Sequence, residues 1–358
     1  MLKTHHITLA VVVALSTSLT ACGGGGGGGG TPTTSADPAA QSNGTSLPAV
    51  TTTVYGNLRG ASLGLNASLN GAVPFPADNA WNTDISKSPV DPNSTAILTS
   101  IGLDAGLHPD FGSEKAYGGP IGIPYVVVAS SQPKVPMHWT AYGDESDPGP
   151  YPVPANAPVE GGSASTGDRH VLVIDRDNNR LYELGNGFYN PDGSWNANCG
   201  AIFFLDGNDV RPGGQPGWTS ADAAGLPIFP GLARYEEAAA GPGGIKHALR
   251  FTVRSSRKAY VPPATHWASS NTSVNLPPMG MRVRLKASYV IPSTFTKETR
   301  ALLTAMKTYG LIVADNGGNW FVSGAPDDRW NNDKLVSELE QVKGSNFEVV
   351  RMDGLVHP

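Results

Sequence analysis

Residues 167–185, GDRHVLVIDRDNNRLYELG, decide the fold class of this chain. Two runs that are rich in aliphatic and aromatic residues, HVLVI and LYEL, stand on either side of the polar hexapeptide DRDNNR. Asn and Asp favour tight turns, whereas Val, Ile and Tyr favour strands, so this stretch predicts a β-hairpin. Similar short runs lie outward in both directions: IPYVVV from residue 123, AIFFL from residue 201 and LRFTV from residue 249. The chain is therefore predicted to be mainly β.

Two segments near the C-terminus have helical rather than strand periodicity. The segment 296–309 places its large apolar side chains on one stripe and is followed by Gly310, a typical helix stop. The segment 333–343 repeats this design before Gly344. Helices that follow many strands predict a β-sandwich or a jelly-roll-like fold with two C-terminal helices.

The first 22 residues have the layout of a secretory signal. Lys3 gives a positive start, and the apolar run ITLAVVVAL, residues 7–15, is too short to cross a bilayer. The following tetrapeptide LTAC, residues 19–22, resembles the lipobox of bacterial lipoproteins. The resemblance implies a signal peptide over 1–21 and a diacylglyceryl group on Cys22, which would attach the protein to a membrane.

The residue after the cysteine and the segment behind it extend this expectation. Gly23 stands where an aspartate would imply the inner membrane, so similarity to the sorting pattern of two-membrane bacteria implies the outer membrane, facing periplasm or exterior. Residues 22–72 are rich in Gly, Thr, Pro and Ser and are predicted to be a disordered tether. Residues 73–358 are predicted to form a single β-rich domain. A net charge of -5, without a basic stripe, argues against nucleic acid as a partner.

Four residues are candidates for catalysis. Strand alternation puts His170 and His247 on the apolar faces of their strands, where a histidine either packs in the core with both ring nitrogens bonded or lines a site. Asp168 precedes His170 by two residues, and Glu183 lies across the hairpin. Glycoside cleavage needs two carboxyl groups, which Glu183 could form with Asp168 or with Asp222.

Aromatic residues suggest a surface that contacts sugars. The seven tryptophans lie in contexts rich in Asn, Gly and Ser, where an exposed ring could stack on a sugar and a buried ring would fill space under a loop. The residues selected as candidates for substrate binding are Trp139, Arg250, His266 and Trp267.

A cofactor is not expected, although two kinds of metal site stay open as alternatives. Asp144, Glu145 and Asp147 lie in one short loop and offer the oxygen ligands that Ca²⁺ prefers, but they do not follow an ordered calcium loop. A transition metal would need histidines to converge through the fold, since no two of them have a tight ligand spacing; the histidines considered are His138, His170, His247 and His266.

The body of the chain, from about residue 73 to 350, resembles a family of secreted bacterial β-rich proteins. The phrases that carry the resemblance include GDRHVLVID from 167, HALRFTV from 247, PPMGMRVRLKAS from 277 and ADNGGNWFVSGAPDDRW from 314. The resemblance implies no mechanism. The segment PMGMRVR from 278, followed by DNGG from 315, also resembles small double-psi barrels that act on cell walls. That similarity implies an α+β fold with a small barrel as the alternative architecture.

Three functions are compatible with these features. The first is an extracellular enzyme that acts on polysaccharides, a glycoside hydrolase or lyase, through carboxylate and histidine acid–base chemistry. The second is a non-catalytic module that binds a glycan or the cell wall, and the third is a secreted enzyme that depends on Cu, Zn or Fe. Convergence of the candidate carboxylates and histidines in one place would favour an enzyme.

The lipobox generates the first testable prediction. Because thioether formation needs the Cys22 sulfur, Cys22→Ser should release the body from membranes or leave it as uncleaved precursor. Fractionation and labelling with radioactive palmitate measure this, and a variant that is labelled like the unaltered protein would rule the lipid anchor out.

Overall fold

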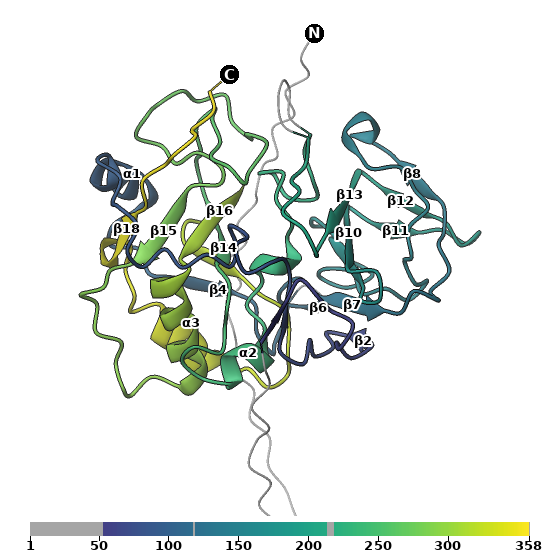
Figure 1. The fold of residues 1–358 in the computed structure, drawn as a ribbon, viewed down its shortest axis with the longest axis horizontal. Helices are drawn as coiled ribbons and strands as arrows, with labels where there is room; N and C mark the ends of the chain where they lie inside the picture. Colours follow the sequence, from purple (N-terminus) through teal and green to yellow (C-terminus); the bar gives the residue numbers. More distant parts are fainter. Residues whose placement is uncertain (1–52, 117–118, 213–217, 358) are drawn as a thin grey trace, which may run out of the picture. The chain divides into compact units, whose positions relative to one another are not determined.

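The computed structural model describes residues 53–116, 119–212 and 218–357, and two sheets dominate this part of the chain (Figure 1). The first sheet has the strand order β13-β10-β9-β7-β2, with β2 Gly64–Leu65, β7 Tyr125–Val128, β9 Val171–Asp175, β10 Arg180–Gly185 and β13 Cys199–Phe204. The second has the order β18-β15-β16-β14-β17-β4, with β4 His108–Asp110, β14 Leu249–Val253, β15 Arg282–Leu285, β16 Leu311–Asn316, β17 Phe321–Ser323 and β18 Phe347–Val349.

Shorter strands and helices complete the described chain. The minor sheets pair β1 Val54–Tyr55 with β3 Ala72–Val73, β5 Lys115–Ala116 with β6 Gly119–Pro120, and β12 Trp195–Ala197 with β8 Met137–Trp139 and β11 Phe188–Tyr189. The α-helices are α1 Ser94–Ile101, α2 Tyr235–Ala239, α3 Lys297–Thr308 and α4 Asn332–Leu339, and the 3-10 helices are η1 Gly143–Glu145, η2 Phe229–Gly231 and η3 Gly344–Asn346. Within the described ranges, no helix has both the length and the apolar character needed to cross a membrane.

The predicted hairpin is confirmed. Strands β9 and β10 pair antiparallel, with Glu183 opposite Leu172. The turn contains Asn179 at a φ of 52°, a left-handed conformation that Asn tolerates better than most residues. The hairpin forms the centre of the first sheet, because β7 lies beside β9 and β13 lies beside β10.

The mainly β fold and the two C-terminal helices are also confirmed. Helices α3 and α4 occupy the predicted segments, and the Thr296 side chain caps α3 by accepting a hydrogen bond from the Thr299 amide. The sheets are mixed, since β7 runs parallel to β9 and β14 runs parallel to β16, whereas the strands of a jelly roll are antiparallel. Alternation of apolar residues predicts strands but does not report their direction.

One continuous core contains side chains of both sheets. On the first sheet, Leu172 and Ile174 pack into this core together with residues of the second sheet such as Phe251 and Val313. The alternate side chains of β9, Val171 and Val173, pack into a separate cluster on the opposite face. His170 therefore lies on the side of the first sheet that faces the shared core, as strand alternation predicts.

The boundary of the predicted tether is wrong. Residues 53–72 belong to the folded body, where β1 and β3 pair and Leu58, Ala61 and Leu69 lie in the core. These few apolar residues are spaced among Gly, Ser and Asn, and the average composition of such a segment does not reveal that each of them is buried. The lipobox, Cys22 and the predicted signal peptide lie outside the described residues.

This correction predicts a difference between two leucines of the same segment. Leu58 is fully buried, whereas Leu63 is 51% exposed. Leu58→Ala should lower the free energy of unfolding by about 2–5 kcal/mol because it leaves a cavity, whereas Leu63→Ala should change it by less than about 0.5 kcal/mol. Urea unfolding followed by circular dichroism measures both. Equal effects would mean that residues 53–72 are not part of the core.

Candidate functional site

Charged side chains gather where the two sheets meet, around a buried ion pair. Arg250 on β14 donates from its terminal guanidinium nitrogens to Asp222 Oδ1, at 2.9 Å, and to Ser323 Oγ, at 2.6 Å. Asp222 lies in the loop that follows β13, so this ion pair connects a loop of the first sheet to the second sheet. Both partners are almost fully buried. Burial raises the pKa of the Asp222 carboxyl, although the positive charge of Arg250 opposes this.

His170 connects this loop to a second one. Its Nδ1 lies 2.6 Å from Glu160 Oε2, and its Nε2 lies 3.0 Å from the Ala221 carbonyl oxygen. Both partners are acceptors, so both ring nitrogens must carry hydrogen and the ring is an imidazolium. Burial alone would lower the pKa of His170, but the negative charge of Glu160 and its hydrogen bond outweigh burial and raise it to about 10. His170 is thus a fixed cation that positions Glu160 and the Asp222 loop.

Glu160 is held as an ionised carboxylate. Burial would raise its pKa, but the His170 charge and two hydrogen bonds from His170 lower it below the usual range. Its side chain keeps 25% of its surface exposed. Glu160 therefore presents a negatively charged oxygen near solvent while His170 fixes its orientation.

The pKa of Asp315 is shifted in the opposite direction to that of Glu160. It lies near the end of β16 and is partly exposed. The surrounding protein raises its pKa to about 7, through burial first and the nearby Asp222 charge second, while Arg250 opposes the shift. A carboxyl group with this pKa is protonated in a large fraction of molecules at neutral pH. The sequence pattern offered one signal for it, an aspartate directly after a buried apolar run and before two glycines, where strands often end in functional loops.

Exposed groups complete what we call the inter-sheet cluster, which comprises Asp110, Glu160, Asp168, His170, Asp222, Arg250 and Asp315. Asp110 ends β4 and Asp168 precedes β9, and both reach solvent. Desolvation by the surrounding protein raises the pKa of Asp110, the nearby His108 opposes this, and the charges of Glu160 and Asp168 add to it. The cluster thus passes from the buried Asp222–Arg250 pair to carboxylates at the surface.

Glu183 lies on β10 and is fully buried. Its Oε1 accepts hydrogen bonds from the backbone amides of Ile228, at 2.9 Å, and Phe229, at 3.0 Å. Burial raises its pKa to about 7 against these two hydrogen bonds. The contacts of this carboxyl group fix the start of η2, so Glu183 supports the fold beside the cluster and does not reach solvent.

The structure does not bring His247 to the cluster. His247 is 1% exposed, and its Nε2 lies 3.2 Å from Glu237 Oε2 and 3.0 Å from the Arg234 guanidinium. Its Nδ1 lies 2.8 Å from the Ala248 carbonyl oxygen. Strand alternation correctly predicted that His247 is buried, but its ring nitrogens are satisfied by Arg234 and Glu237, at the start of α2, and by the carbonyl oxygen of Ala248.

Of the four residues selected for substrate binding, two lie at the inter-sheet cluster and two lie elsewhere. Arg250 belongs to the cluster, and His266 lies beside it because its Nδ1 is 3.0 Å from the carbonyl oxygen of Ala223, next to Asp222. Trp267 stacks against Tyr260 at a centroid distance of 5.9 Å and is half-buried. Trp139 packs with the second core cluster, on the face of the first sheet that contains Val171 and Val173.

Two of the three residues of the acidic loop considered for calcium bind protein groups instead. Glu145 accepts a hydrogen bond from the Thr219 amide at 2.9 Å, and Asp147 accepts one from the Ile202 amide at 2.8 Å and pairs with Arg211. Asp144 is exposed. Across the described ranges, no three or more His, Cys, Asp or Glu side chains are grouped so that they could hold a metal ion.

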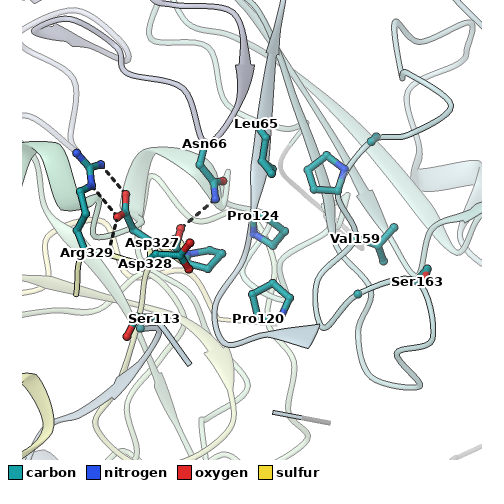
Figure 2. Close-up of a pocket in the computed structure, with 15 residues that line it drawn as sticks. Leu65, Asn66, Ser113, Pro120, Pro124, Val159, Ser163, Asp327, Asp328 and Arg329 are labelled. Carbon is teal, nitrogen blue, oxygen red and sulfur yellow. Dashed lines mark hydrogen bonds and ion pairs between the residues drawn. The ribbon is translucent and has the colours of Figure 1, made fainter. Parts of the chain in front are cut away.

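A pocket of about 640 Å³ is lined by segments that are adjacent in sequence to cluster residues, although no cluster residue lines the pocket itself (Figure 2). Three chain segments contribute to both: 110–113, 157–163 and 323–329. In each segment one residue belongs to the cluster or bonds to it, namely Asp110, Glu160 or Ser323, and its neighbours line the pocket. Figure 2 shows prolines between a charged end, formed by residues 327–329, and an end near Val159 and Ser163.

The His170–Glu160 pair predicts a pH dependence of stability. Because the folded pKa of His170 is raised from its usual 6.5 to about 10, its contribution is complete below pH 6.5 and is lost as pH rises through about 10. The stability difference between the unaltered protein and His170→Gln should therefore be largest near pH 6 and shrink toward pH 10. Urea unfolding at several pH values measures this, with the exposed His138→Gln as control. A difference that stays constant between pH 6 and 10 would contradict an imidazolium at this position.

Comparisons of the chain with models of protein families, with curated proteins and with solved structures find no match.

Proposed function

We propose that this protein is a surface-anchored, extracellular glycoside hydrolase that acts on a polysaccharide. The observation that carries the proposal is the pair Asp315 and Glu160, two partly exposed carboxyl groups whose surroundings push their pKa values in opposite directions. Hydrolysis of a glycosidic bond needs one carboxyl group that is protonated and one that is ionised. The charges of Arg250 and His170 act on both groups, which supports their placement in one site.

In this scheme Asp315 is the general acid. It would protonate the oxygen of the departing sugar, and a pKa of about 7 keeps it protonated in the acidic range and in a large fraction of molecules at neutral pH. Glu160 is the ionised partner, which either activates a water molecule or attacks the sugar directly. Arg250, His170 and Asp222 are positioning residues, because their polar atoms are engaged with one another and with the two loops.

Charge favours hydrolysis over elimination. A lyase that cleaves a uronate polysaccharide must neutralise the substrate's carboxylate, which requires a cation that is available to it. The cations within the cluster are already paired, Arg250 with Asp222 and His170 with Glu160. Exposed carboxylates at Asp110 and Asp168 would repel an anionic substrate further.

The anchor is part of the same proposal. The lipobox ending at Cys22 supports attachment to the outer membrane, and an enzyme held outside the cytoplasm has access to extracellular or periplasmic polysaccharide.

Substitution of the proposed acid gives a specific prediction. Asp315→Asn should lower hydrolysis of a polysaccharide by about 10² to 10⁴, because protonation of the leaving group is lost. It should retain most of the activity on dinitrophenyl glycosides, whose leaving group needs no proton. Glu160→Gln should lose activity on both substrates, and the exposed Asp104→Asn should lose neither. Release of reducing sugar and of dinitrophenol measures these rates.

The pH profile checks the same assignment. For the unaltered enzyme, kcat/KM should fall as pH rises through about 7, where Asp315 loses its proton. Asp315→Asn should lack this alkaline limb on the activated glycoside. If the unaltered protein binds a glycan but hydrolyses nothing from a broad polysaccharide panel, the hydrolase proposal is wrong and the protein is a binding module. Activity that EDTA removes and Cu or Zn restores would instead establish a metal enzyme.

A further inference from the structure

We propose that the pocket in Figure 2 binds an amine-bearing sugar unit, so that the ligand of this protein is a hexosaminoglycan with free amino groups. The inference rests on the proposed function for what happens to the bound glycan, whereas binding itself can be measured without cleavage.

The location of the pocket supports its use by the same ligand. Val159 and Gly162 line the pocket, while Glu160 between them pairs with His170 in the cluster. Gly112 lines the pocket two residues after Asp110. The loop 157–163 therefore contributes Val159 and Gly162 to the pocket and Glu160 to the cluster.

The lining combines apolar surface with hydrogen-bonding groups, as a site for a pyranose ring requires. Prolines 120, 124 and 326 together with Val159 offer apolar surface for the C–H face of a sugar. Ser163 offers an exposed hydroxyl group that can bond to ring substituents, whereas the Ser113 hydroxyl donates to Asn332 Oδ1 at 3.1 Å (Figure 2). The volume of about 640 Å³ lies within the range of sites that bind small ligands.

The charge of the pocket favours a sugar that carries an amino group over one that carries an acidic group. At one end of the pocket Arg329 forms two hydrogen bonds to Asp327, of 2.8 and 2.6 Å, so the charges of these two residues offset each other. Asp328 beside them is exposed, and within the described residues its carboxylate forms no ion pair (Figure 2). Within the described residues, this end of the pocket thus carries one uncompensated negative charge. An ammonium group is attracted to this end, and a uronate or sulfate is repelled.

Isothermal titration calorimetry on the full chain at pH 5.5 tests the inference with three tetrasaccharide probes. The glucosamine tetramer should bind, the N-acetylglucosamine tetramer should bind several-fold more weakly, and the galacturonate tetramer should not bind. Asp328→Asn should lower the affinity for the glucosamine tetramer by up to about fivefold, as expected for one exposed ion pair, and leave the affinity for the N-acetylated tetramer unchanged. Val159→Trp should weaken both because it fills the pocket, and Asp104→Asn, an exposed carboxylate elsewhere, should have no effect.

The outcomes separate this inference from the proposed hydrolysis. If the glucosamine tetramer does not bind, if the galacturonate tetramer binds as well, or if Asp328→Asn and Val159→Trp leave its affinity unchanged, the pocket assignment is wrong even where the protein hydrolyses another polysaccharide. If the tetramer binds with the expected selectivity but no glycan is cleaved at any pH, the pocket assignment holds and the hydrolase proposal fails.

Discussion

The buried ion pair between Asp222 and Arg250 is the contact on which the rest of the site depends. A guanidinium buried at the meeting of two sheets would be costly without a partner, and Asp222 supplies the compensating charge. Holding Asp222 fixes the loop around it, since the Ala224 amide bonds to the Ala314 carbonyl at 3.0 Å, directly before Asp315. The same loop provides the carbonyl of Ala221 to His170. One ion pair thereby brings carboxyl groups from both sheets together.

From that arrangement the electrostatics follow. Burial first, and the negative charge of Asp222 second, raise the pKa of Asp315, whereas His170 holds Glu160 ionised. Burial raises the pKa of both carboxyl groups; at Asp315 the Asp222 charge adds to this rise, whereas at Glu160 the His170 charge and hydrogen bonds outweigh it. Removing Arg250 would leave Asp222 as an uncompensated buried charge, so the fold and the protonation of the site are not separable at this position.

Local patterns in the sequence predict the hairpin around β9 and β10, helices α3 and α4, and the inward face of His170, because each depends on neighbours within a few residues. They do not predict that Glu160 pairs with His170 or that Asp315 approaches Asp222, since these contacts join loops and strands that are far apart in the chain. His247 shows the limit of the same reasoning, because the pattern predicts its burial but not its charged partners Arg234 and Glu237, which lie at the start of α2.

The central claim is that Asp315 and Glu160 carry different protonation states in the folded protein. The most direct measurement is a pH titration of the side-chain carboxyl carbons by NMR, with each signal assigned through the corresponding amide variant. We expect a midpoint for Asp315 at about 7 and a midpoint for Glu160 below its usual value of 4.5. An Asp315 signal that titrates together with exposed aspartates would contradict it.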